Sequence, residues 1–451
     1  MKNVDIQLSI PKQCQKVLDI FEANGYEAYL VGGCVRDSIL GKQPYDWDIC
    51  TEALPEEILR LFQNYRVILT GLQHGTVTVL IDKMPIEITT YRIDGEYLDN
   101  RHPKEVIFTK KLWEDLSRRD FTINALAYHP KKGIIDCFEG LEDLKKRQIR
   151  AVGNAVERFH EDGLRIMRAI RFATVLNFSY DDDTEQAILT CSYLLKNIAT
   201  ERIQVELNKI LLSPWVKRGL NDLYRFGCFS CFLPEMCHTY GFEQNNPYHK
   251  YDVFQHTLES VSLVENDIVL RLAMLLHDVG KPFVWENCYE GNDCFPLHEV
   301  ESEKIAKKFL QSMHYDNRTI DEVCKLIINH NLQILDQDVN LRVHLSHLGP
   351  TTLEHLLNVK KADLAAQNEL LFPVVELIEK MKVRLQQILE RNDCYSLKQL
   401  AINGSDMKAL GYEGKEIGAC LQEALEEVLQ DPQKNEREYL LRFVQKRRFK
   451  K

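Results

Sequence analysis

The chain has 451 residues, of which 45% are hydrophobic and 27% are charged, and its formal net charge is −10. This length suggests about three structural units, and the composition is that of an ordinary globular protein. The negative charge excludes a protein that is basic throughout, but it leaves room for a local basic groove that binds nucleic acid. We find no run of about 18 apolar residues, which excludes a membrane-spanning helix.

Two features bear on the cellular compartment. The first residues lack the basic segment followed by an apolar segment that marks a secretory signal. The thirteen cysteines are scattered along the chain, which fits reduced thiols better than a disulfide framework. We therefore expect a cytoplasmic protein.

The apolar pattern predicts a mixed head of helices and strands, followed by a long helical body. The expected elements of the head are a helix over 11–23, a strand over 28–31, a helix over 35–40 and strands between 67 and 93. Residues 138–230 turn strongly helical, and from about residue 250 the chain reads almost entirely as helix. The fold class is therefore α+β in the head and all-α in the body.

The segment VGGCVRDSILGKQPYDWDIC carries the first candidate site. Gly32 and Gly33 follow a strand and precede a helix, where the backbone can approach a phosphate closely. Arg36 can add a charge-assisted contact to that phosphate. Asp46 and Asp48 are separated by one residue, so in an extended segment they face the same side and could hold one or two Mg²⁺ ions. In this order and spacing, the motifs indicate a polymerase-beta-type nucleotidyltransferase.

A third carboxylate usually completes such a site from a nearby strand. Glu87, in the segment PIEITTYR, is the candidate. The alternative is that Glu87 is an exposed strand residue without a role in the site.

Three further segments extend the pattern: EDLSRRDFTINALAY (114–128), ERFHEDGLRIMRAIRF (157–172) and ERIQVELNKIL (201–211). With these segments the chain resembles the superfamily of class II tRNA nucleotidyltransferases (CCA-adding enzymes) and bacterial poly(A) polymerases over most of its length. The resemblance implies that Asp46 and Asp48 bind Mg²⁺ and that Gly33 and Arg36 hold the triphosphate. It also implies that Arg118 and Arg119 contact the nucleotide.

The segment EDGLR is the most informative of these for specificity. On a helix, Asp162 and Arg165 would lie three residues apart on one face, and Arg168 and Arg171 would continue that row. A carboxylate beside a guanidinium can imitate a base-pairing partner that accepts C and A, which carry an exocyclic amino group, and rejects U and G. Arg168 and Arg171 would then brace this pair or meet phosphates. The alternative is a surface ion pair of little weight.

Between the strands and the RRD segment lies a stretch around Gly95 whose charge mix predicts a mobile loop. The resemblance implies that this loop helps the enzyme switch from adding C to adding A.

A second constellation lies in the helical body. Histidine and aspartate ligands drawn from several helices suit a divalent metal, and their order resembles the HD phosphohydrolase superfamily. The residues that match its ligand set are His256, His277, Asp278 and Asp363, with His298 and His330 as additional ligands of two-metal members. Lys281 could meet a substrate phosphate. The alternative is that these histidines are hydrogen-bonded core residues of an RNA-binding body.

The sequence thus predicts an Mg²⁺-dependent enzyme that adds the 3′-terminal CCA to tRNA from CTP and ATP. The open alternatives are a poly(A) polymerase, an enzyme that adds only CC or only A, and an HD phosphohydrolase whose head binds RNA. The expected partners are the tRNA 3′ end and acceptor stem, with no membrane and no obligate protein partner. The expected parts are a head (1–145), a neck with the nucleobase template (146–215), a body with the HD domain (216–375) and a tRNA-binding tail (376–451).

Overall fold

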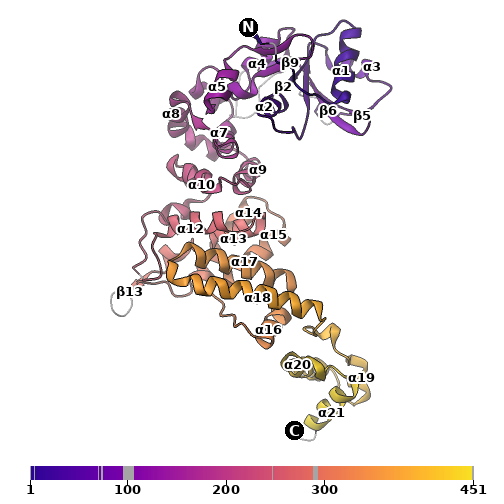
Figure 1. The fold of residues 1–451 in the computed structure, drawn as a ribbon, viewed down its shortest axis with the longest axis vertical. Helices are drawn as coiled ribbons and strands as arrows, with labels where there is room; N and C mark the ends of the chain where they lie inside the picture. Colours follow the sequence, from indigo (N-terminus) through magenta and orange to yellow (C-terminus); the bar gives the residue numbers. More distant parts are fainter. Residues whose placement is uncertain are drawn as a thin grey trace. The chain divides into compact units, whose positions relative to one another are not determined.

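A computed structural model describes residues 2–4, 6–69, 71–72, 75–94, 106–245, 247–287 and 293–448 (Figure 1). Contacts between residues divide the chain into two compact units, Met1–Phe232 and Leu233–Lys451. The division into head, neck, body and tail stays a prediction. The predicted mobile loop around Gly95 lies outside the described residues.

The first unit is built on an eight-stranded mixed sheet in the order β1-β10-β9-β2-β3-β6-β5-β4. Its strands are β1 (Lys2–Val4), β2 (Ala28–Val31), β3 (Asp48–Thr51), β4 (Arg66–Ile68), β5 (Thr76–Ile81), β6 (Met84–Thr90), β9 (Leu126–His129) and β10 (Gly133–Asp136). Within this sheet all pairings are antiparallel except that of β3 with β6, which is parallel. Two small ladders join β7 (Arg92–Asp94) to β8 (Val106–Phe108) and β11 (Gln148–Ile149) to β12 (Ser179–Tyr180).

The burial of the strands explains the sequence pattern. Along β5, in the sequence TVTVLI, every second residue is buried, as expected for a strand with one face on the core. All four residues of β2 are buried; this strand lies in the middle of the sheet and packs against α1 and α2. The α+β class of the head is confirmed.

Eleven helices belong to the described part of this unit. They are α1 (Lys12–Ala23), α2 (Gly33–Ile39), α3 (Pro55–Leu61), α4 (Leu112–Ser117), α5 (Gly140–Lys146), α6 (Ala155–Glu161), α7 (Leu164–Leu176), α8 (Asp182–Cys191), α9 (Thr200–Leu211), α10 (Val216–Arg225) and α11 (Phe229–Phe232). The sheet contacts α1, α2 and α3, and α7 packs on α9 and α10. Helix α2 begins at Gly33 instead of the expected residue 35, because the turn is completed by Gly32 alone, whose φ is +75°.

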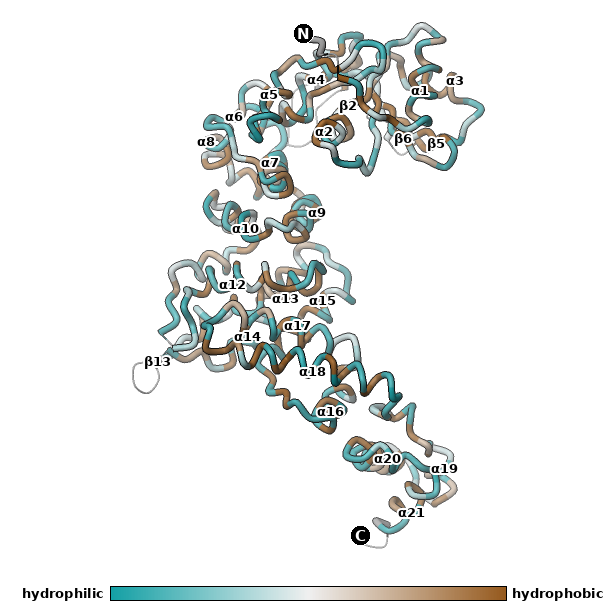
Figure 2. Tube along the Cα trace, in the orientation of Figure 1, coloured by the Kyte–Doolittle hydropathy of each residue, from teal (hydrophilic) through white to brown (hydrophobic). Residues whose placement is uncertain are grey.

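The second unit is almost entirely helical, as predicted. Its helices are α12 (Val253–Leu263), α13 (Ile268–Leu276), α14 (His298–Ser312), α15 (Asn317–Asn329), α16 (Asp338–Leu348), α17 (Pro350–Ala366), α18 (Phe372–Glu390), α19 (Gly404–Ala409), α20 (Lys415–Gln430) and α21 (Arg437–Arg448). One small hairpin joins β13 (Glu286–Asn287) to β14 (Asp293–Cys294). The alternation of apolar and polar residues along α18 (Figure 2) leaves Ile378, Met381, Leu385 and Ile388 on its buried face, the spacing of an amphipathic helix.

The cysteines and the hydropathy of the helices bear on two expectations from the sequence. Eleven cysteines among the described residues are free. None of the helices in the described ranges combines the length and the apolar character that a membrane crossing requires.

Candidate functional site

The carboxylates of the head converge because of strand geometry. Asp48 is the first residue of β3, and Asp46 precedes it by two residues, while Trp47 between them is only 7% exposed and belongs to the core. The parallel pairing of β3 with β6 sets Asp48 directly opposite Glu87. Side chains opposite each other on neighbouring strands lie close together on one face. The structure therefore brings the three predicted carboxylates to one place.

The electrostatics of this place favour a cation. Burial raises the pKa of Asp48 to about 6, and the charges of Asp46 and Glu87 add to the effect, while Arg119 opposes it. Like charges gathered in a partly buried site are neutralised well by a divalent ion with oxygen ligands. These acidic groups could hold such a metal. Glu87 itself is exposed.

A cavity of about 500 Å³ opens beside the carboxylates. It is lined by Gly32, Gly33, Arg36, Asp46, Asp48, Arg118, Arg119, Asp120, Asn124, Asp162, Arg165, Arg168, Arg171, Phe172 and Lys209. Six of the fifteen are arginines, so the cavity suits a polyanion. All eight residues predicted for nucleotide binding line it, as do Asp46 and Asp48, whereas the predicted catalytic residue Glu87 does not.

Two features favour glycine at position 32. Its φ of +75° lies in the left-handed region that side chains rarely adopt. A Cβ at this position would also stand 2.9 Å from Nη1 of Arg119. The glycine therefore lets the arginine of the RRD segment lie against the turn between β2 and α2.

The side chain of Arg36 is held in place by two neighbours. It donates from Nε to Oδ1 of Asp37 at 2.8 Å and from Nη1 to Oδ1 of Asn124 at 2.6 Å. Its guanidinium carbon lies 4.9 Å from the ring centre of Phe172. Arg36 is thus a fixed positive charge at the cavity wall.

Arg118 and Arg119 are anchored by one buried acid. Asp115 is fully buried and accepts hydrogen bonds from Nε and Nη2 of Arg118, at 2.9 and 2.8 Å, and from Nη2 of Arg119 at 3.4 Å. Although burial disfavours its charge, the two arginines outweigh that effect and hold the pKa of Asp115 below its usual range. Asp115 was not among the predicted site residues, although it stands three residues before the pair.

Arg168 and Arg171 are held by acids from other elements. Arg168 donates from Nε to Oδ2 of Asp120 at 2.8 Å, and Arg171 pairs with Glu206 of α9. The guanidinium of Arg171 stacks on Phe172 at 3.6 Å from the ring centre, and that of Arg168 lies at 5.4 Å. Phe172 therefore stands among three arginines, counting Arg36.

The predicted arrangement of Asp162 and Arg165 on one helix face is wrong. Asp162 lies between α6 and α7 with an extended backbone, at φ −143° and ψ 104°, because the helix is interrupted before Gly163. Its carboxylate pairs with Arg202 of α9, through Nη1 at 3.2 Å and Nη2 at 2.8 Å. Arg165 instead donates to the carbonyl oxygens of Arg158 and Arg118, each at 3.0 Å. Both side chains nevertheless line the same cavity.

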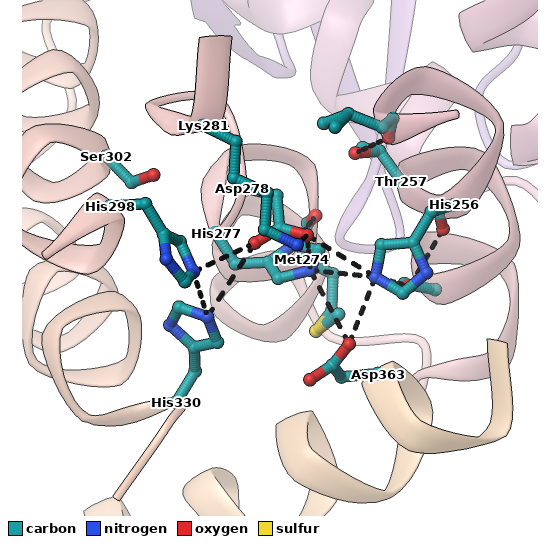
Figure 3. A network of polar contacts seen from close by, with 12 residues as sticks. His256, Thr257, Met274, His277, Asp278, Lys281, His298, Ser302, His330 and Asp363 are labelled. Atoms are coloured by element: carbon teal, nitrogen blue, oxygen red, sulfur yellow. Dashed lines mark hydrogen bonds and ion pairs between the residues drawn. The ribbon is translucent and has the colours of Figure 1, made fainter. Parts of the chain in front are cut away.

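In the second unit, all six predicted residues meet in one cluster, which we call the His/Asp cluster: His256, His277, Asp278, His298, His330 and Asp363 (Figure 3). They come from α12, the end of α13, the start of α14, the end of α15, and α17. Two groups of three are close enough to share an ion, and Asp278 belongs to both. One group is completed by His256 and His277, and the other by His298 and His330.

The hydrogen bonds of the histidines prepare them as ligands. His277, His298 and His330 each place Nδ1 within 2.6–2.9 Å of a backbone carbonyl oxygen, which assigns the proton to Nδ1. In the neutral imidazole the lone pair then lies on Nε2, and these atoms face one another and Asp278, with 3.2 Å between those of His298 and His330. Burial lowers the pKa of His330 to about 3, so this imidazole is neutral. Lone pairs and a carboxylate that face inward fit a divalent cation.

Lys281 contacts this cluster, but through Asp278. Its Nζ donates to Oδ2 of Asp278 at 2.7 Å and to Oε1 of Gln244 at 2.8 Å. A cavity of about 490 Å³ opens over the cluster and includes Lys281 and His249, a histidine that the sequence analysis missed. Burial lowers the pKa of His249 to about 4.

Three family models match the chain. They are the poly A polymerase head domain over residues 28–150, the probable RNA and SrmB-binding site of polymerase A over 177–239, and a putative tRNA nucleotidyltransferase domain 2 over 296–444.

Individual proteins match over longer stretches. A CCA-adding enzyme of Levilactobacillus brevis is 51% identical over 48% of this chain and 54% of its own length. For this and several similar relatives, the chain spans about half the length of the curated protein it matches. A CCA-adding enzyme of Enterococcus faecalis is 33% identical over 97% of both chains. The crystal structure of the Bacillus stearothermophilus CCA-adding enzyme in complex with CTP matches with a TM-score of 0.73 and 28% identity, over 98% of this chain and 99% of that one.

Proposed function

Since the chain belongs to the CCA-adding enzyme family, we propose that it adds the 3′-terminal CCA to tRNA from CTP and ATP and releases pyrophosphate. The observation that carries the proposal is the pairing of Asp48 with Glu87 beside Asp46, at the edge of an arginine-lined cavity. The CTP bound to the Bacillus stearothermophilus relative supports the choice of nucleotide.

Asp46, Asp48 and Glu87 are the residues that would hold Mg²⁺. When bound, this ion would lower the pKa of the attacking 3′ hydroxyl and neutralise charge on the leaving pyrophosphate. Arg36, held by Asp37 and Asn124, would then meet the triphosphate as a preorganised charge.

The arginines on α7 complete the phosphate site in this proposal. Arg168 is held by Asp120 and Arg171 by Glu206, which also lies 3.8 Å from Nη1 of Arg168, so their geometry is set before the substrate enters. Gly32 leaves room for Arg119 beside the turn that precedes α2. Little rearrangement of these groups would then be needed during the reaction.

Asp162 and Arg165 would select the base. Both line the cavity, but Asp162 is held by Arg202 and Arg165 by backbone carbonyl oxygens. A carboxylate accepts from the exocyclic amino group of C or A, and a guanidinium donates to the neighbouring ring acceptor. U and G carry an oxygen at the position of the amino group, so the carboxylate would meet a second acceptor. RNA contacts would come from 177–239 and 296–444, where the family models for RNA binding and for tRNA nucleotidyltransferase domain 2 match.

The test is an incubation of purified protein and Mg²⁺ with a tRNA that lacks its 3′ CCA. CTP and ATP are given singly and together, and the 3′ ends are sequenced. Addition of C, C and A followed by arrest supports the proposal. A long A tail would indicate a poly(A) polymerase, whereas CC alone or A alone would indicate a specialised enzyme, and no incorporation would refute the proposal.

A second activity is favoured by the His/Asp cluster: we propose that it binds one or two divalent metals and hydrolyses phosphate esters at RNA ends. Its two groups of ligands share Asp278, and the overlying cavity can admit a substrate. These residues would hold the metal, which would supply a water activated for attack on phosphorus. Elemental analysis of protein purified without chelator tests the metal. Release of phosphate from a tRNA with a 2′,3′-cyclic or terminal phosphate, compared with Asp363→Asn, tests the reaction.

A further inference from the structure

The carboxylate of Asp162 is oriented by a residue outside the cavity. Arg202, near the start of α9, donates from Nη1 to Oδ1 at 3.2 Å and from Nη2 to Oδ2 at 2.8 Å. Asp162 lines the cavity, whereas Arg202 is not among its lining residues. Any influence of Arg202 on a bound base would therefore pass through Asp162.

Asp162 has little local support of its own. It is the residue between α6 and α7, it is extended, and Gly163 follows it. Apart from Arg202, its carboxylate accepts a hydrogen bond from the backbone N–H of Leu164, at 3.1 Å to Oδ1. One contact to one oxygen allows rotation of the carboxylate, whereas the two-point contact from a planar guanidinium fixes its plane.

The hydrogen-bond acceptor position that remains on the Asp162 carboxylate matches the amino group of the base that it would select. An ionised carboxylate offers about four acceptor positions. Among the described residues, Arg202 and Leu164 occupy two on Oδ1, and Arg202 occupies one on Oδ2. The position left on Oδ2 can take one N–H, as an exocyclic amino group provides and an exocyclic oxygen does not. The direction of that position depends on the plane that Arg202 sets.

We propose that Arg202 is a positioning residue that sets nucleotide choice by fixing the plane of the Asp162 carboxylate. The inference rests on the proposed function, since it requires that Asp162 reads the base. Lysine at position 202 would keep the positive charge but replace the planar fork with a single rotating ammonium group. Asp162 would then keep its charge partner and lose its fixed orientation.

The experiment measures single-turnover addition for Arg202→Lys and the unaltered protein. A tRNA without CCA receives CTP or UTP, and a tRNA ending in CC receives ATP or GTP. We expect Arg202→Lys to lower both preferences at least about tenfold, the effect of one misplaced hydrogen bond, while tRNA binding and the thermal unfolding temperature stay unchanged. The matched control is Arg225→Lys on α10, which alters ion pairs with Glu185 and Asp222 away from the cavity and should keep both preferences.

A double variant separates positioning from a general structural role. If Arg202 acts through Asp162, adding Arg202→Lys to Asp162→Ala should change the preferences no further. Equal losses of rate for correct and incorrect nucleotides in Arg202→Lys, or losses of preference that multiply in the double variant, would overturn the inference. Arg202→Gln, which also lacks the fork, serves if the lysine variant does not fold.

The nucleotide preference of the unaltered protein distinguishes a failure of the proposed function from a failure of the role proposed for Arg202. If it fails to prefer CTP and ATP, the proposed function itself fails. If it prefers them and Arg202→Lys does so equally, only the role of Arg202 is refuted.

Discussion

Asp48→Asn should stabilise the metal-free protein while it abolishes nucleotide addition. Asp48 lies beside Asp46 and Glu87, and burial together with these charges raises its pKa from 3.8 to about 6. The difference of about 2 pKa units corresponds to a ceiling of about 3 kcal/mol of unfolding free energy, at about 1.4 kcal/mol per unit. Because the site opens to a cavity at the protein surface, where solvent weakens the repulsion, we expect roughly 1–2 kcal/mol.

The sign follows from proton binding. With its pKa raised in the folded state, Asp48 binds a proton more tightly in the folded than in the unfolded chain. The destabilisation is therefore absent below the unfolded pKa of 3.8 and complete above about 6. Asparagine carries no charge at any pH. The unfolding free energy of Asp48→Asn should therefore exceed that of the unaltered protein by an amount that grows across this interval and stays constant above it.

Urea denaturation in EDTA at about pH 7.5 and about pH 4 measures the effect. The exposed residue Asp19 provides the control, since Asp19→Asn should shift the unfolding free energy by less than about 0.5 kcal/mol. With Mg²⁺ present, the unaltered protein should become more stable than Asp48→Asn, because only the unaltered site is stabilised by binding the ion. An Asp48→Asn variant that is no more stable at the higher pH, or whose advantage does not depend on pH, would refute the argument that the three carboxylates repel one another.

Three other substitutions test the remaining parts of both sites. Asp162→Ala should weaken the rejection of UTP and GTP by about tenfold or more without weakening tRNA binding; unchanged discrimination in competition assays would contradict its role. His277→Ala should lower the content of bound transition metal, measured by elemental analysis, while CCA addition continues, and an unchanged metal content would count against the His/Asp cluster. Gly32→Ala should cost about 1–2 kcal/mol of unfolding free energy, since it places a side chain at positive φ and 2.9 Å from Arg119; denaturant titration measures this, and an equally stable variant would show that the turn relaxes.

The parts of the sites that follow a strand period were predictable from the sequence. The spacing of Asp46 and Asp48 predicted that they meet at one site, and both line the same cavity, although Asp46 lies in a bend just before β3. Glu87 was found because it lies in a neighbouring apolar strand. The same reasoning failed at Asp162, where three-residue spacing suggested one helix. The interruption before Gly163 puts the aspartate in an extended conformation instead.

The partners of the charged groups could not be predicted, because they come from distant parts of the chain. Asp162 pairs with Arg202, forty residues away, and Arg171 pairs with Glu206. Each of these acids and bases has several possible partners in the sequence, and only the packing of α7 on α9 selects one. The residues of the His/Asp cluster could be predicted by their order, but the presence of Asp278 in both groups of three depends on how five helices and the turn after α13 pack.

The parallel register of β3 and β6 also predicts where the chain tolerates changes of length. The facing of Asp48 and Glu87 is fixed by a ladder of backbone hydrogen bonds, so residues inserted in the turns between these strands leave the two carboxylates opposed. A single residue inserted or deleted within β6 ahead of Glu87 would shift the register by one position and turn this side chain to the other face. Ile86 or Ile88, both fully buried, would then stand opposite Asp48. Homologous chains should therefore vary in the connections and keep β6 at constant length.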